Sequence, residues 1–143
     1  MTFRADLDRI CREHRLLSLY LFGSRAEDGL KILAGEKADR EGSDLDIGAV
    51  FAADDLMEPE FDFWSLSRLQ VDLEDLFAPL HVDLVPLQKV DALFQFRAFS
   101  GHRIAETQPT RNAYYELAVM RLASELLPIQ RELEREQFGW SST

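Results

Sequence analysis

The sequence predicts an α/β fold, a small mixed sheet of about three to five strands with helices packed on it. Two observations predict it. Apolar runs with strand composition occur at 16–22, 45–51 and 81–86, and apolar residues at three-and-four spacing mark helices around them. At 143 residues and 46% hydrophobic content, the chain can bury roughly two-thirds of its unfolded surface. We therefore expect a single domain, 1–143.

The first third of the chain predicts helix, strand and helix. Apolar residues recur at helical spacing up to about His14, with Thr2 as the N-cap, so 1–15 is expected to be an N-terminal helix. The strand at 16–22 should end in a tight turn at Gly23. Ser24 can cap a second helix that runs to about Leu33, with Glu27 completing a capping box. A polar stretch at 33–42, bounded by glycines, is expected to be an inserted loop.

The middle of the chain predicts two further strands and two helices. The strand at 45–51 is apolar on both faces, which suits a central position in the sheet. After a turn-like acidic segment, a helix should start at a Ser65 cap and stop before Pro79. The short strand at 81–86 ends at its proline. A helix from about 90 to 100 follows, closed by Gly101, and the core of the domain is expected to extend to 104.

A C-terminal helical segment is expected at 109–136, with Pro128 as a kink or break. Its apolar residues form one long stripe, so the helix can either complete the core or offer a surface to a partner. Both roles are compatible. The stripe consists of Tyr115, Val119, Leu122, Leu126, Ile129 and Leu133.

Composition limits the function classes. A formal net charge of −10 disfavours nucleic acid as a direct partner, whereas a basic protein is easily accommodated. No apolar run approaches the ~20 residues of a membrane span, and the N-terminus lacks a hydrophobic signal region. We therefore expect a soluble, cytoplasmic protein without membrane contact. Cys11 is the single cysteine, which excludes an internal disulfide and favours a role in core packing.

The residues that point to chemistry gather around the first two strands. Asp44 and Asp46 share one face because alternate strand residues point the same way, and Asp83 lies on the next strand along the chain. Three carboxylates at one place repel each other, and a divalent cation relieves that repulsion. Oxygen-only ligation selects Mg²⁺ or Mn²⁺, and two such ions can support phosphoryl-group chemistry. At the end of the preceding strand, Gly23 lets the backbone approach a phosphate, and the Ser24 hydroxyl can bind one.

An Asp-x-Asp pattern alone is weak in a chain with 26 acidic residues. The chain supplies its own control in Asp6-Leu7-Asp8, which lies at a helix start, where acidic residues complement the helix dipole. Asp44 and Asp46 instead interrupt the start of an apolar strand, where an uncompensated charge is costly. Their placement, rather than the pattern itself, indicates a site.

Together these residues resemble the pattern of a minimal nucleotidyltransferase of the DNA polymerase β superfamily. The resemblance covers 16–104 and rests on the Gly-Ser turn, the Asp-x-Asp pair and the third carboxylate. It implies that Asp44, Asp46 and Asp83 are catalytic and ligate Mg²⁺, with two ions and ATP as the substrate. It also makes Gly23, Ser24, Arg25 and Ser43 candidate nucleotide-binding residues, although a solvated arginine is an equally good interpretation of Arg25. The interval from Arg25 to Ser43 is longer than the family's usual linker.

Small members of this family are similar to MNT-type antitoxins, which are encoded beside an all-helical HEPN ribonuclease toxin. The resemblance implies a protein adenylyltransferase that transfers AMP from ATP onto a toxin tyrosine and silences the toxin. Two alternatives stay open: an antitoxin that acts by stoichiometric binding alone, and a small-molecule nucleotidyltransferase of the antibiotic type. Polymerase-like activity is disfavoured because the chain is acidic.

Several other residues are interpreted as structural. Arg97 and His102 match the Arg-x4-His spacing of a HEPN nuclease, yet Gly101 would interrupt the helix that such a motif needs. His14 and His81 are interpreted as helix-end and strand-edge residues rather than metal ligands. For Trp64 and Trp140, packing in the core or at its rim is favoured over a role in anchoring a surface.

Overall fold

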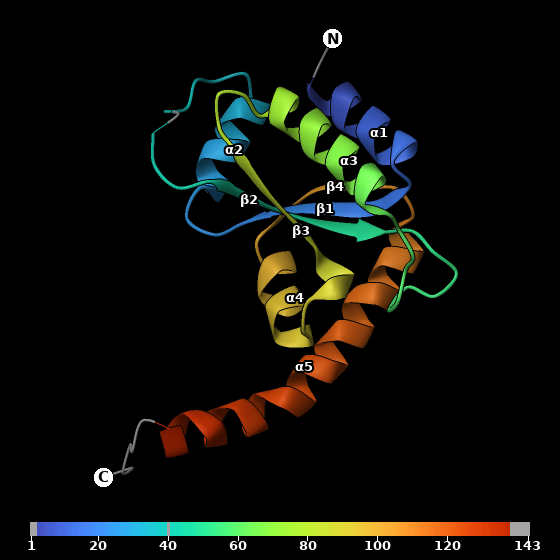
Figure 1. Cartoon of the computed structure of the whole chain (residues 1–143), viewed down its shortest axis with the longest axis vertical. Helices are drawn as coiled ribbons and strands as arrows, with labels where there is room; N and C mark the ends of the chain where they lie inside the picture. Colours follow the sequence, from blue (N-terminus) through green and yellow to red (C-terminus); the bar gives the residue numbers. More distant parts are fainter. Residues whose placement is uncertain (1–2, 40, 138–143) are drawn as a thin grey trace.

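The computed structural model describes residues 3–39 and 41–137 and shows a sheet covered by helices on both faces (Figure 1). The elements in chain order are α1 (Phe3–Glu13), β1 (Leu16–Phe22), α2 (Ala26–Leu33), β2 (Leu45–Phe51), α3 (Phe63–Leu76), β3 (Val82–Pro86), the 3-10 turn η1 (Leu87–Lys89), α4 (Ala92–Phe99), β4 (His102–Glu106) and α5 (Pro109–Gln137). The predicted fold class is confirmed. None of the described helices combines the length and apolar character needed to cross a membrane.

The sheet is mixed and has the strand order β3-β2-β1-β4. The β1 strand is antiparallel to both of its neighbours, whereas β2 and β3 are parallel. The three predicted strands are confirmed, and β4 is an additional one. Because β4 is a short edge strand that starts with exposed His102 and Arg103 and buries only Ile104, its sequence lacks the apolar run that identifies an inner strand.

Two hydrophobic clusters lie on opposite faces of the sheet. One packs α1, α2 and α3 against β1 and β2, and it includes Ile10, Cys11 and Leu73, which are almost fully buried. The other packs α4 and the first part of α5 around Tyr20. Figure 1 shows these two layers of helices on either side of the strands. Cys11 therefore is a core residue, and burial, together with the charge of Asp8, raises the pKa of its thiol to about 12.

Two predicted helix caps are wrong. The α2 helix begins after Arg25 rather than after Ser24, and no side chain caps its first turn, so the Ser24–Glu27 capping box does not form. The α3 helix is capped by Asp62, whose carboxylate accepts a hydrogen bond from the Ser65 backbone N–H at 2.7 Å. An aspartate three residues earlier is an equally good N-cap, so composition alone could not choose between them. The predicted Thr2 cap lies outside the described residues.

The α5 helix is continuous from Pro109 to Gln137, so Pro128 does not break it. Figure 1 shows the helix curving as it extends beyond the body of the domain. Its predicted stripe divides into two parts. Tyr115 and Val119 are buried against α4 and the sheet, whereas the four later members of the stripe are exposed. These exposed members are Leu122, Leu126, Ile129 and Leu133.

A buried polar network fastens the start of α5 to β1. Asn112 is fully buried; its side-chain oxygen accepts a hydrogen bond from Ser18 at 2.7 Å, and its amide donates to the Tyr20 hydroxyl at 2.8 Å. The Tyr20 hydroxyl in turn donates to the carboxylate of Glu116. The Asn112 amide also donates to the carboxylate of Glu106 on β4 at 3.0 Å. Each polar group in the network has a partner, so the cost of burying it is offset.

Candidate functional site

The candidate site forms where β2 and β3 begin side by side. In the parallel pairing of these strands, Asp46 lies directly opposite Asp83. Asp44 comes two residues before Asp46, immediately ahead of β2, and is exposed. The register of β2 and β3 therefore places Asp46 and Asp83 on adjacent strands, as predicted, and Asp44 lies beside the pair.

The surroundings of Asp46 at this site disfavour its charged form. The pKa of Asp46 is raised, first by partial burial, then by the charge of Asp83 and a hydrogen bond with it, and to a smaller extent by the charge of Asp44. Each of these effects disfavours the ionised form of Asp46. The fold thus holds negative charges near each other without a basic side chain among the causes of the shift, which is an arrangement that a cation would stabilise.

Gly23 lies against the carboxylate of Asp46. The last residue of β1, Phe22, pairs with Asp46 across the sheet, so the turn after β1 passes over the aspartate. A Cβ atom at Gly23 would lie 2.2 Å from the Asp46 Oδ2 atom, and Gly23 has φ 78°, a conformation that favours glycine. Only glycine meets both demands, so the turn and the aspartate form one unit.

Ser24 and Ser43 close the long interval between the turn and the aspartates. Their hydroxyl oxygens are 3.1 Å apart, and both residues are exposed. The two ends of the interval therefore lie side by side. Both predicted nucleotide-binding serines are next to Gly23 and Asp44 as a result. Their role toward a nucleotide stays a prediction.

Arg25 has a position that the sequence did not indicate. Only 8% of it is exposed, so the interpretation as a solvated arginine is wrong. Its guanidinium donates to the Asp28 carboxylate at 2.6 Å and to the backbone carbonyls of Glu41 and Ser43 at 3.1 and 2.9 Å, and it also bonds the carbonyl of Asp39. Because these bonds occupy four of its five N–H donors, Arg25 holds the returning end of the interval, and direct contact with a nucleotide stays a prediction.

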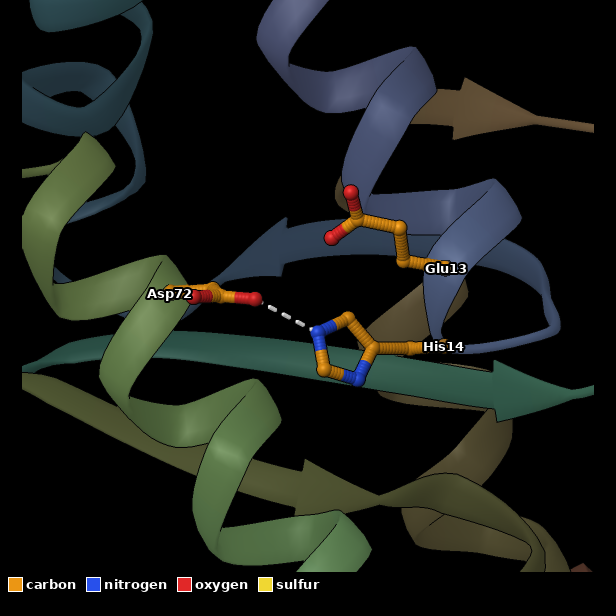
Figure 2. A group of neighbouring side chains, drawn as sticks. All are labelled: Glu13, His14 and Asp72. Atoms are coloured by element: carbon orange, nitrogen blue, oxygen red, sulfur yellow. Dashed lines mark hydrogen bonds and ion pairs between the residues drawn. The ribbon is translucent and has the colours of Figure 1, made fainter.

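A second group of side chains lies elsewhere, between α1 and α3 (Figure 2). Within residues 3–39 and 41–137, one group of at least three His, Cys, Asp or Glu residues has ligand atoms that all lie within 4.8 Å of one another. It consists of Glu13, His14 and Asp72. By the same measure, Asp44, Asp46 and Asp83 are more widely spread. His14 Nε2 is 2.6 Å from Asp72 Oδ2, so His14 joins the two helices. From the sequence, His14 was interpreted only as a helix-end residue, because its partner Asp72 is 58 positions away.

This second group borders a hollow of about 550 Å³, which is also lined by Arg15, Arg68 and Phe51. Phe51 is the last residue of β2, whereas Asp46 lies near the start of that strand. The hollow is therefore at the other end of β2 from the candidate site. Glu13 is already ion-paired with Arg9 at 3.5 Å, so the group is interpreted as a polar contact between helices.

The fold and the strand-end aspartates define a class of protein, and comparison with known families identifies it. Residues 6–110 match the family described as Polymerase beta, Nucleotidyltransferase, so the chain belongs to that family. The resemblance inferred from the Gly-Ser turn and the aspartates is confirmed at this level. No curated protein matches the chain significantly.

Solved structures share the fold over nearly the whole chain. A mutant of the toxin–antitoxin pair MntA–HpeT matches with a TM-score of 0.67 at 16% identity, over 94% of this chain and 98% of that chain. A toxin–antitoxin structure with AMP-PNP matches with a TM-score of 0.66 at 17% identity, with the same coverage. The complex of tri-AMPylated Shewanella oneidensis HEPN toxin with MNT antitoxin matches at 0.64 and 16%, over 95% and 96% of the two chains. At such identities the likeness concerns the fold.

Proposed function

We propose that this nucleotidyltransferase is an antitoxin that transfers AMP from ATP to a tyrosine of a cognate HEPN-type toxin. The observation that carries the proposal is the unit formed by Gly23, Asp46 and Asp83, in which a glycine turn lies against a crowded carboxylate pair. Transfer of a nucleotide needs both parts, because the turn can admit a phosphate and the carboxylates can bind the cation that accompanies it. The use of ATP is consistent with the expected cytoplasmic location.

The residues present fit magnesium. Asp44, Asp46 and Asp83 offer oxygen ligands only, which is the donor set that Mg²⁺ prefers. The pKa of Asp46 is raised by partial burial and then by the charges of Asp83 and Asp44, with no basic side chain among the causes. These three aspartates would hold the metal, with two ions as the expected number. When bound, Mg²⁺ would neutralise charge on the triphosphate and on the departing pyrophosphate.

The chain's own residues would then serve the transfer as follows. The tyrosine oxygen of the toxin forms a bond to the α-phosphorus of ATP, and the bond from that phosphorus to the pyrophosphate oxygen breaks. The phenolic proton passes to a carboxylate at the site, for which Asp83 is the proposed acceptor, and pyrophosphate leaves. Gly23 and Ser24 bind the terminal phosphates, with Ser43 beside them, while the bonds of Arg25 keep the returning loop in place.

Three features support a protein partner of the toxin type. The matched solved structures are toxin–antitoxin complexes, one of which contains an AMPylated HEPN toxin. The match extends over at least 94% of both chains in each case. The net charge of −10 opposes a nucleic-acid substrate of the polymerase type.

Arg97 lies in α4 and His102 in β4, so this chain does not present its own Arg-x4-His spacing on one helix.

The test uses the protein encoded by the neighbouring reading frame. That protein is incubated with this chain, ATP and Mg²⁺, and its intact mass is measured. We expect additions of AMP, with the modified residue located on a tyrosine by fragmentation. An unchanged mass with wild-type enzyme would reject the transferase proposal. Incubation with labelled ATP but no toxin would reveal a product only if a small molecule is the acceptor.

Stoichiometric binding without catalysis is the second candidate function. It is favoured by one observation, the spread of the three aspartates compared with the tighter group at Glu13, His14 and Asp72. The double change Asp44→Ala with Asp46→Ala separates the two functions. A pure binder would still neutralise the toxin after this change, whereas a transferase would not.

A further inference from the structure

The exposed half of the α5 stripe has the spacing of a helix-packing seam. Tyr115, Val119, Leu122, Leu126, Ile129 and Leu133 follow one another at alternating intervals of four and three residues. This is the heptad spacing with which a helix packs along another helix. The stripe passes from the core into solvent without a change of spacing.

The two halves of the seam differ only in whether something covers them. Tyr115 and Val119 are covered by α4, and the Tyr115 hydroxyl donates to Gln95 of that helix at 2.6 Å. The last four members have no such cover from the described residues, with exposed fractions between 37% at Leu126 and 59% at Leu133. Four large apolar side chains in line, over about 17 Å of helix, form a continuous uncovered face. Figure 1 shows this part of α5 standing away from the sheet and the other helices.

The charges beside the seam indicate what kind of helix would cover it. Glu125 and Glu132 are seven residues apart, so they lie along the same edge of the uncovered face, in the positions that pair with charges of a packed helix. Glu132 is also 3.4 Å from Arg135 of its own helix, an exposed ion pair of the kind that contributes little and that a partner's cation can share. A second copy of this chain would bring a further net charge of −10 and the same acidic edge. A helix with an apolar stripe and flanking lysines or arginines instead complements both the shape and the charge.

We propose that residues 122–133 of α5 are a docking seam for a basic, amphipathic helix of the protein partner. The proposal rests on the proposed function, because the expected partner there is an all-helical toxin. The seam lies on a different element from Asp44, Asp46 and Asp83, so binding through it is separable from catalysis. It would retain the partner while its tyrosine reaches the site.

The test measures affinity for the purified helical protein encoded by the neighbouring frame, with intact full-length chains. Leu126→Glu with Ile129→Glu alters the centre of the seam, and the matched control, Leu117→Glu with Met120→Glu, places the same charges on exposed apolar positions of other faces of α5. We expect the seam variant to bind about 30-fold or more weakly, as central interface residues do, and the control to bind as wild type. Equal thermal unfolding of both variants shows that the fold is retained.

Charge reversal is the second arm. Glu125→Lys with Glu132→Lys should weaken binding, and added salt should weaken wild-type binding more than that of this variant. Equal affinity of the seam variant and wild type, or no binding by wild type, would overturn the proposal. A wild-type homodimer in sedimentation that the seam variant dissolves would also overturn it, since the occupant would then be a second copy.

The two proposals fail in different ways. The Asp44→Ala, Asp46→Ala variant should bind as tightly as wild type while transferring no AMP. Tight, seam-dependent binding without any mass addition would reject the transferase function and leave the docking seam standing. If Leu126→Glu with Ile129→Glu leaves AMP transfer unchanged, the docking seam is rejected and the transferase function is retained.

Discussion

Two groups of polar residues border strand β1, but only one of them satisfies its own members. Within the strand, Ser18 and Tyr20 join Asn112 and Glu116 in a network where each buried group has a partner. Beyond its last residue, Gly23 lies against Asp46, whose pKa is raised by burial and by neighbouring aspartates. The first region is arranged for stability, and the second carries an electrostatic cost that a bound cation would remove.

The difference shows how to separate structural from functional polar clusters in this fold. A structural cluster combines donors with acceptors, as the amide of Asn112 does, so that burial is offset within the protein. A functional cluster has one kind of group in excess and awaits a ligand of opposite character. Four changes, ordered from the largest expected effect to the smallest, can break or sharpen this contrast.

Asp46→Asn is expected to lower AMP transfer by more than about 100-fold, since even the outer partners of a metal ligand contribute 10- to 100-fold. Because it removes one charge of a crowded set, the same change should leave the unfolding temperature at pH 7 unchanged or raise it. Mass spectrometry and calorimetry measure the two effects. Asp8→Asn, in the other Asp-x-Asp, is the matched control and should leave transfer intact. A large loss of stability in Asp46→Asn would place this residue in the structural class.

Asn112→Leu should have the opposite profile. It keeps much of the side-chain volume but removes the partner of Ser18 and one partner of Tyr20, so we expect a loss of roughly 1–3 kcal/mol in the free energy of unfolding. Chemical denaturation measures the loss, and the control is Gln130→Leu, at a half-buried position of α5 outside the network. Protein that remains folded should transfer AMP at a rate close to that of wild type. An unchanged stability would show that the network does not fasten α5.

Gly23→Ala and Gly35→Ala form a matched pair. Both glycines have positive φ, 78° and 82°, so both alanine variants incur the same backbone strain of about 1 kcal/mol. Only at Gly23 does the new methyl group meet the Asp46 carboxylate, whereas at Gly35 nothing lies within 4 Å. We therefore expect Gly23→Ala to lose transfer activity and Gly35→Ala to retain it. Equal activity in both variants would contradict the close approach of turn and aspartate.

Asp62→Ala should produce the smallest effect and a defined pH dependence. The pKa of Asp62 is lowered by hydrogen bonding from the Ser65 backbone N–H, so its charged form stabilises the fold. That contribution is present above the usual carboxylate pKa of 3.8 and is lost as the pH falls through the lower, folded value. The variant should melt slightly below wild type at pH 7, and the difference should close at the acidic end. A difference that persists at low pH would mean that capping is not its cause.

Much of the fold and the site could be predicted from local pattern. The strands 16–22 and 45–51 were predicted to the residue, because continuous apolar runs between turn residues define inner strands. Asp44, Asp46 and Asp83 could be proposed as site residues because charges rarely interrupt such strands, and their role stays a prediction. The β4 strand and the role of Arg25 were not found, since each depends on contacts with residues distant in the sequence.

The sequence by itself determined the class of fold and the family, and it indicated which residues to propose for the site, since periodicity and the cost of burying charge are local properties. The tertiary structure decided which of those residues touch. Pairing of β2 with β3 set Asp46 opposite Asp83, and the turn after β1 placed Gly23 on the same carboxylate. It also decided that the α5 stripe, uniform in sequence, is half core and half exposed, because burial depends on where α4 and the sheet end.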